Sequence, residues 1–260
     1  MSARDAFVSL FAGPFKGFAR RVLGPSLYQQ VRVTFLGEHS GLGLDWRWGN
    51  SLRRTHPVRR DFGWQAGQPI DRYYTEEHFL PGYRADIRGR VMEIADDRYT
   101  RQFGDGQVTV SDVLHLTPNA PGATIFGSLT NADHIPADSF DCIIVTFTLQ
   151  FIFDVRAAIR TLARILKPGG VVLLVFPGIS QISRYDMDHW GDFWRFTSLS
   201  TRRLFEEAFH PEDVTVKTYG NVLAATASLH GLIATELRRE ELDHWDRDYE
   251  LVIGVRAVKR

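Results

Sequence analysis

Between residues 139 and 176 the chain reads SFDCIIVTFTLQFIFDVRAAIRTLARILKPGGVVLLVF. Two short apolar runs rich in β-branched residues, 142–147 and 171–176, are typical of strands buried on both faces. Between them apolar side chains recur at helical spacing, and Lys167-Pro168-Gly169-Gly170 ends the helix that this spacing predicts. The helical positions are Val155, Ile159, Leu162, Ile165 and Leu166. A strand, a helix and a second strand in this order predict a βαβ unit with parallel strands.

The same alternation of strands and helices extends in both directions from this unit. Further strands are predicted over 91–94, 108–110, 123–126, 214–219 and 249–258, and a helix over 202–209. Repeated βαβ units predict one doubly wound α/β domain with a mostly parallel sheet. The domain proper is expected over 81–260, with residues 1–80 as a helical and irregular arm packed on the core.

Composition narrows the class of protein. A chain of 260 residues with 44% hydrophobic content suits a single α/β core with additions. Its 31 basic and 31 acidic side chains cancel, so no global field attracts nucleic acid or an anionic membrane. The single cysteine, Cys142, excludes an intramolecular disulfide and suits a cytoplasmic location. No apolar stretch approaches the roughly 20 residues that span a bilayer, so we expect neither a signal peptide nor an integral membrane segment.

The first eighty residues differ from the rest. Phe7, Phe11, Phe15 and Phe18 recur at near-helical spacing beside basic residues, which predicts a docked amphipathic helix or a basic surface that touches a membrane. An irregular stretch then carries Trp46, Trp48, Arg53, Arg54, His56, Arg59, Arg60 and Trp64. These arginines either are solvated charges or hold a phosphorylated acceptor.

Acidic residues follow the first two predicted strands. Glu93 lies at the end of the first strand, and Asp112, nineteen residues later, is expected to end the second. In a doubly wound sheet the ligand lies outside the carboxyl ends of the strands, and a carboxylate in the second position can hold ribose hydroxyls. Acidic residues at strand ends are also common as helix caps and turn formers.

Together these features resemble a known family. The run from Val91 to Phe176, with its Leu-Lys-Pro-Gly-Gly turn before the fifth strand, resembles the class I S-adenosylmethionine-dependent methyltransferases. That resemblance implies a Rossmann-like sheet of seven strands whose last strand is antiparallel. It also implies S-adenosyl-L-methionine as cofactor, S-adenosyl-L-homocysteine as product, and a small-molecule acceptor.

The resemblance implies a role for each matching residue. Glu93 would anchor the cofactor loop and the methionine end, and Asp112 would accept from the ribose. The remaining contacts would be Val113, Ser128 and Leu129 around the adenine, and Thr146, Phe147 and Gln150 beneath the sulfonium.

The cofactor loop departs from the family pattern. Where the family has Gly-x-Gly-x-Gly, this chain has Ala95, Asp97 and Tyr99, whose Cβ atoms restrict positive φ and close approach to a ligand. Either the loop, which begins at Ile94, follows another path, or cofactor binding has been lost. On another path Tyr99 covers the cofactor and Asp96 or Asp97 accepts from its ammonium group. Before the domain, Arg72, Tyr73 and Tyr74 either clamp the cofactor carboxylate or pack as a helix on the sheet.

An acceptor-binding insertion is expected at about 178–200. It supplies Tyr185, Asp186, Asp188, His189 and Asp192. His189 is the candidate base, oriented by Asp188 or Asp192, because histidine titrates near working pH; a lone histidine is also often structural. The run 190–200 is similar to a Trp-Arg-Phe-Thr stretch of relatives associated with glycan assembly. Metal ligands at a recognisable spacing are not found.

The predicted function is therefore methyl transfer to an oxygen of a small molecule in a biosynthetic enzyme, with a sugar or glycosylated metabolite as the expected acceptor. One alternative is a binding or scaffold protein that keeps the fold without methylating. Another is a nicotinamide-dependent oxidoreductase, although the Gly-x-Gly-x-x-Gly of that class is missing. The sequence leaves a homodimer open.

Overall fold

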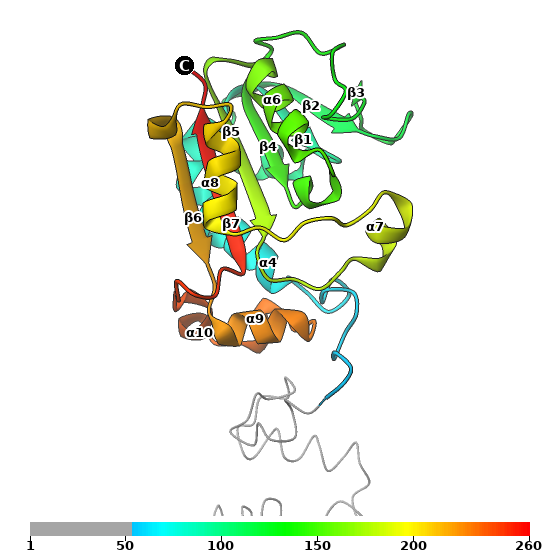
Figure 1. Ribbon diagram of the computed structural model, residues 1–260, viewed down its shortest axis with the longest axis vertical. Coiled ribbons are helices and arrows are strands. Elements are labelled where there is room, and N and C mark those ends of the chain that lie inside the picture. Colours follow the sequence, from blue (N-terminus) through cyan, green and yellow to red (C-terminus); the bar gives the residue numbers. More distant parts are fainter. Residues whose placement is uncertain (1–53) are drawn as a thin grey trace, which may run out of the picture. The chain divides into compact units, whose positions relative to one another are not determined.

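A seven-stranded sheet with the order β3-β2-β1-β4-β5-β7-β6 is the centre of the computed structural model, which describes residues 54–260 (Figure 1). Its strands are β1 Gly89–Ile94, β2 Val108–His115, β3 Ile125–Phe126, β4 Phe140–Thr146, β5 Leu166–Pro177, β6 Val214–Tyr219 and β7 Val252–Val258. Strands β1 to β5 pair in parallel, and β7 lies antiparallel between β5 and β6. The predicted fold, a mostly parallel sheet with an antiparallel last strand, is confirmed.

Helices connect and cover the strands. They are α4 Ile70–Tyr73, α5 Arg98–Phe103, α6 Val155–Ile165, α7 Arg184–His189, α8 Ser198–Glu206, α9 Val222–Leu229 and α10 Arg239–Asp243. A π-helix, Tyr74–Phe79, follows α4, and 3-10 turns occupy Pro81–Asp86, Leu149–Phe151, Pro211–Asp213 and Ala234–Glu236. Figure 1 shows α6 and α8 on one face of the sheet, while the cyan segment that contains α4 lies on the other.

The core forms where α6 and α8 pack on the sheet. The predicted apolar stripe of α6 is buried there, and the side chain of Asp154 caps the helix by accepting from the N–H of Ala157 at 2.9 Å. From α8, Phe205 packs edge-on against Phe176 of β5. The same periodicity that predicted the helix therefore anchors β4 and β5, whose ends carry site residues.

The fifth strand begins earlier than its apolar run suggests. Leu166 already pairs with Phe140, and the register then shifts before Cys142 pairs with Val171. Gly169 takes up this irregularity with a φ of 77°, and Lys167 forms an ion pair with Asp141 at 2.7 Å. The Lys-Pro-Gly-Gly stretch thus ends the helix, as expected, and also enters the sheet.

The N-terminal expectations fall partly outside the described residues. The phenylalanines at 7, 11, 15 and 18, together with Trp46, Trp48 and Arg53, lie there. Residues 57–80 of the expected arm belong to the same compact unit as the sheet, Pro57–Arg260. Within the expected insertion, α7 is the one helix that lies wholly between residues 178 and 200 of the described chain.

Candidate functional site

Two adjoining cavities lie at the carboxyl ends of β1, β2, β4 and β5. The larger, of about 600 Å³, is lined by the ends of β1, β2 and β4. The smaller, of about 410 Å³, lies between residues 60–72, the loop after β5 and helix α7. Both cavities are lined by Trp64, Arg72, Phe147, Phe151, Tyr185 and Asp186. A large ligand in one cavity would therefore face a second ligand in the other.

Glu93 lies buried in the wall of the larger cavity. Its carboxylate accepts from the backbone N–H groups of Tyr99 and Thr100, at 3.1 and 2.8 Å, and from the Thr100 hydroxyl at 2.9 Å. These bonds hold the loop after β1 against the start of α5. Burial raises the pKa of Glu93 to about 7, and the hydrogen bonds from Thr100 and Tyr99 oppose that rise.

The loop after β1 keeps a glycine-like backbone without the glycine. Ala95 lies in the left-handed region with a φ of 72°, and its N–H donates to the carbonyl of Leu114 at 3.0 Å. Ile94, Ala95, Asp96 and Tyr99 all line the larger cavity. Asp97 does not: its carboxylate pairs with Arg101 at 3.1 Å on the outer side of α5. Of the two predicted acceptors for an ammonium group, only Asp96 is therefore in position.

Arg72 lies between the two cavities. Its guanidinium lies 4.4 Å from the ring centroid of Phe147, and its Nη1 donates to the Tyr99 hydroxyl at 3.2 Å and to Thr146 Oγ1 at 3.4 Å. Its Nε is buried without a hydrogen-bond partner in the described chain. A free donor beside a cavity suits a ligand carboxylate.

Tyr74, the second predicted clamp residue, is elsewhere. Its ring is buried against Tyr219, and its hydroxyl donates to the carbonyl of Leu242 at 2.8 Å. The same helical turn directs Tyr73 to Asp243 at 2.6 Å. The clamp expectation therefore fails for both tyrosines, and the alternative of aromatic packing holds for them.

Asp112 does not end its strand, which corrects the sequence prediction. Strand β2 runs on to His115, and the carboxylate of Asp112 pairs with Arg90 Nε at 2.7 Å and accepts from the Thr124 hydroxyl at 2.9 Å. Asp112 lies outside the lining of both cavities, as does its buried neighbour Val113. The expected contacts of these two residues with ribose and adenine are not supported by their positions.

His115 lies where Asp112 was expected. Leu114 pairs with Ile94 at the end of β1, and His115 follows as the last residue of β2. The imidazole lines the larger cavity, and its Nδ1 accepts from the N–H of Thr117 at 2.9 Å, which places the proton of the neutral ring on Nε2. Sequence reasoning missed it because the second strand was predicted five residues too short.

The remaining predicted cofactor residues divide between the cavities. Ser128, Leu129, Thr146 and Phe147 line the larger cavity, and Phe147 also lines the smaller. Gln150 lines only the smaller cavity, where its Oε1 is buried without a partner in the described chain, while its Nε2 donates to the carbonyl of Phe147 at 2.7 Å. Gln150 was expected beneath the cofactor sulfonium, but its side chain faces the smaller cavity instead.

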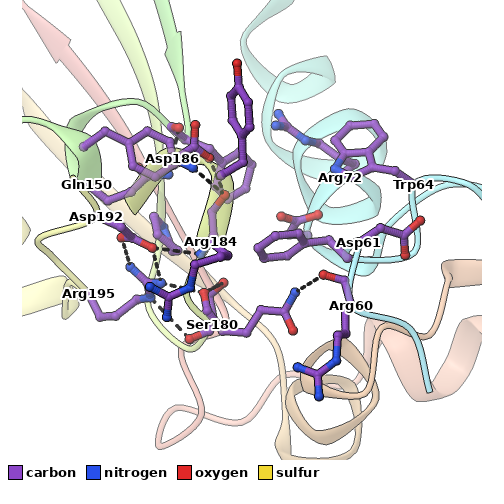
Figure 2. Close-up of a pocket in the computed structure, with 18 residues that line it drawn as sticks. Arg60, Asp61, Trp64, Arg72, Gln150, Ser180, Arg184, Asp186, Asp192 and Arg195 are labelled. Carbon is purple, nitrogen blue, oxygen red and sulfur yellow. Dashed lines mark hydrogen bonds and ion pairs between the residues drawn. The ribbon is translucent and has the colours of Figure 1, made fainter. Parts of the chain in front are cut away.

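Carboxylates and arginines alternate around the smaller cavity (Figure 2). The buried carboxylate of Asp192 pairs with Arg195 at 2.5 and 2.9 Å, and Arg195 Nη2 also donates to the carbonyl of Gln181 at 2.5 Å. Asp192 also accepts from the N–H of Ser183 at 3.0 Å. This network holds the loop after β5 in place as one wall of the cavity. The carboxylate of Asp192 is therefore used to fix the loop.

His189 is not placed as a base. The imidazole is exposed on α7, its Nδ1 contacts the carbonyl of Tyr185 at 2.6 Å, and it lies outside the lining of both cavities. Asp188 is exposed and pairs with Arg184 at 3.4 Å. The structure therefore gives no support to His189 as base with Asp188 or Asp192 as its orienting partner, because α7 turns His189 outward while Tyr185 and Asp186 face the cavities.

The arginine-rich segment also divides. Arg59 pairs with Glu236 at 2.8 Å and donates to the carbonyl of Gly231 at 3.1 Å, which ties the segment to the chain after α9. Arg60 and Trp64 line the smaller cavity.

Within residues 54–260 no group of three or more His, Cys, Asp or Glu side chains is arranged to hold a metal ion. Over the same residues, every helix is too short or too polar to cross a membrane.

Comparisons with known proteins agree with this geometry. The family profile described as a methyltransferase domain matches residues 83–174. The ubiquinone/menaquinone biosynthesis C-methyltransferase UbiE of Escherichia coli O1:K1 is 33% identical over 179 residues, covering 56% of this chain and 71% of that protein. The UbiE of Edwardsiella ictaluri is 26% identical over 185 residues, with the same coverage of 56% and 71%.

Two solved methyltransferase structures align with part of this chain. An S-adenosylmethionine-dependent methyltransferase from Mesorhizobium loti aligns with a TM-score of 0.45 and 19% identity, covering 69% of this chain and 96% of that one. A SAM-dependent methyltransferase from Archaeoglobus fulgidus aligns with a TM-score of 0.46 and 9% identity, covering 73% and 92%.

Proposed function

The chain belongs to the class I S-adenosylmethionine-dependent methyltransferases, and on that premise we propose that it methylates a hydroxyl oxygen of a small polar acceptor. Membership makes the protein an enzyme with S-adenosylmethionine as cofactor, in place of the alternatives of a non-methylating scaffold and a nicotinamide-dependent oxidoreductase. The acceptor that we propose is a sugar or a glycosylated metabolite. Its place is the smaller cavity.

The larger cavity is our proposed cofactor site. A volume of about 600 Å³ is in the range of sites for ligands of this size. Arg72, with its unpartnered Nε, would hold the carboxylate of the methionine end, and Asp96 its ammonium group. Glu93 would hold the loop in place. His115 would donate from Nε2 to a ribose hydroxyl, and Ser128 and Leu129 would border the adenine. Bound there, S-adenosylmethionine supplies a methyl group activated by its sulfonium.

One observation carries the proposal for the acceptor. Two acceptor atoms that line the smaller cavity, Asp71 Oδ1 and Gln150 Oε1, are buried without hydrogen-bond partners in the described chain. Leaving such atoms unpaired costs about 1–3 kcal/mol each. A ligand rich in hydroxyl groups supplies the missing donors, whereas an apolar ligand leaves the cost in place. The cavity is therefore suited to a polyhydroxylated molecule.

Aromatic rings at the mouth of the site support a sugar as acceptor. Trp64, Tyr185 and Trp190 line the cavities and remain 48%, 64% and 44% exposed. Their apolar faces suit the C–H faces of a sugar ring, while the polar cavity would bind the hydroxyl groups. The wall of Asp192 and Arg195 would keep the acceptor aligned with the cofactor, which is the main requirement of an in-line displacement.

The test is methyl transfer by the full chain to a panel of free sugars, glycosides, nucleotide sugars, phenols and quinols. Release of S-adenosylhomocysteine measures the rate, and NMR of the product identifies the methylated atom. We expect a methoxy product from a sugar-containing compound. A product methylated on carbon, the reaction named for the UbiE relatives, would contradict the proposal.

A matched pair of variants locates the acceptor. Gln150→Leu should raise the acceptor KM at least tenfold, about 1.4 kcal/mol, because a lost hydrogen bond leaves hydroxyl groups unpaired. Affinity for S-adenosylhomocysteine should stay within threefold of wild type. Gln102→Leu, at an exposed glutamine of α5 outside both cavities, is the control and should change neither value.

A further inference from the structure

Asp71 differs from every other carboxylate in the smaller cavity. Four aspartates line that cavity: Asp61, Asp71, Asp186 and Asp192. Asp61 accepts from the N–H groups of Gly63 and Gln65, Asp186 accepts from the Ser183 hydroxyl, and Asp192 is paired with Arg195. Of these four, only Asp71 has a buried carboxyl oxygen without a hydrogen-bond partner in the described chain.

Asp71 lies in the first turn of α4, where a carboxylate favours the helix terminus, but its Oδ1 has no hydrogen-bond partner in the described chain. Its backbone carbonyl accepts from the Thr75 hydroxyl at 2.9 Å. The next residue, Arg72, directs its guanidinium to Tyr99, Thr146 and the Phe147 ring. A buried, unpaired carboxyl oxygen is unfavourable for folding, and such groups concentrate at functional sites.

Asp71 lies in the acceptor cavity next to a residue that borders both cavities. Its side chain lines the acceptor cavity, and the adjacent Arg72 lines both cavities. Other charged or titratable side chains that line the acceptor cavity are Arg60 and Asp61 before α4, Arg184, Tyr185 and Asp186 of α7, and Asp192 and Arg195 beyond it. The aspartates among these are already hydrogen-bonded, and none of the arginines can accept a proton.

We propose that Asp71 is the general base that removes the proton from the acceptor hydroxyl. It takes the role that the sequence analysis assigned to His189. This inference rests on the proposed function, since a hydroxyl acceptor must lose a proton. As the acceptor oxygen forms its bond to the methyl carbon, the bond between that carbon and sulfur breaks and its electron pair stays on sulfur. The hydroxyl proton passes to the Asp71 carboxylate and from there to water after product release.

The electrostatics of the site agree with that role. Burial raises the pKa of Asp71, and the charge of Arg72 and the backbone N–H groups of Arg72 and Asp71 lower it by less. A carboxylate with a raised pKa is a stronger base than an exposed one, so it takes a hydroxyl proton more readily in the transition state. By contrast, the hydrogen bond from the N–H of Gln65 lowers the pKa of Asp61.

The first test needs no acceptor. Unfolding of ligand-free wild type and Asp71→Asn by urea is measured from pH 4 to 8. Because the folded state holds the Asp71 proton to higher pH than the unfolded chain, wild type loses stability relative to Asp71→Asn as pH rises. Asp133→Asn, at an exposed aspartate outside both cavities, is the control, and its free energy of unfolding should vary with pH as that of wild type does. An Asp71→Asn difference that is independent of pH would overturn the proposal.

The second test measures turnover with the sugar-containing acceptor found in the panel. We expect Asp71→Asn to lower kcat at least 100-fold at pH 7.5 and to abolish the acidic limb of the pH profile, with S-adenosylhomocysteine affinity within threefold of wild type. Asp71→Glu should recover at least tenfold over Asp71→Asn, and Asp133→Asn should match wild type.

The two failures can be told apart. An oxygen-methylated product formed by Asp71→Asn at a rate within threefold of wild type, with the acidic limb intact, would remove Asp71 as base and leave the proposed function standing. A carbon-methylated product from wild type would remove the proposed function and the base role with it.

Discussion

Ala95 adopts a backbone conformation that glycine accepts more easily. Its φ of 72° costs a residue with a Cβ atom about 1–2 kcal/mol, and the glycine-like path of the loop is nevertheless kept. The hydrogen bond from its N–H to Leu114 and the anchoring of the loop by Glu93 hold it there. The strain at Ala95 is therefore offset by contacts of the loop with β2 and Glu93.

Ala95→Gly should therefore stabilise the protein by up to about 1 kcal/mol, because relief of strain exceeds the added entropy of the unfolded chain. Urea unfolding measures this effect. Ala163→Gly, in the last turn of α6, is the control and should destabilise by up to about 1 kcal/mol, because its helical backbone gives no strain to relieve. An equal decrease in the free energy of unfolding for both variants would show that Ala95 is not strained.

The buried carboxyl of Glu93 predicts a pH dependence of stability. With its pKa raised to about 7 from 4.5, the folded protein keeps a proton that the unfolded chain releases, so the free energy of unfolding falls as pH rises through this window. At about 1.4 kcal/mol per pH unit, the loss amounts to about 3 kcal/mol between pH 4.5 and 7. Glu93→Gln should remove that share of the slope in urea unfolding. A slope equal to that of wild type would show that Glu93 is ionised throughout.

At the scale of elements, the length of β2 decides which residue faces the larger cavity, our proposed cofactor site. Asp112 pairs with Arg90 and Thr124 inside the sheet, whereas His115 ends the strand beside the loop after β1. Asp112→Ala should lower the free energy of unfolding by about 1–3 kcal/mol, with affinity for S-adenosylhomocysteine within threefold of wild type.

His115→Ala should have the opposite pattern, with little change in stability and affinity reduced about tenfold through loss of one hydrogen bond. Calorimetric titration and urea unfolding of the two variants form a crossed comparison. A larger loss of affinity in Asp112→Ala than in His115→Ala would restore the original assignment of Asp112.

For the whole molecule, cofactor binding should appear as added stability. S-adenosylhomocysteine at 100 times its Kd should add about 2.7 kcal/mol to the free energy of unfolding. For a compact unit of this size that corresponds to a rise in Tm of about 5–10 °C. NADH at the same concentration is the control and should leave Tm unchanged. A rise with NADH alone would favour the oxidoreductase alternative.

The sequence by itself determined the fold of this protein. Short continuous apolar runs, the amphipathic helix α6 and its Lys-Pro-Gly-Gly end are local patterns, and they predict strands and helices wherever burial follows the pattern. The approximate position of the ligand follows too, because parallel strands place their carboxyl ends at one edge. Glu93, Thr146 and Phe147 could be located at that edge from sequence alone.

Only the tertiary structure decided which polar side chains face the two cavities. Strand pairing extended β2 to His115 and left Asp112 inside the sheet, and the short helix α7 turned His189 to solvent. Asp71 gave no signal in the sequence, because its distinction is the absence of a partner for a buried oxygen. Whether an oxygen has a partner depends on packing between distant segments, and such contacts are not encoded in any local pattern.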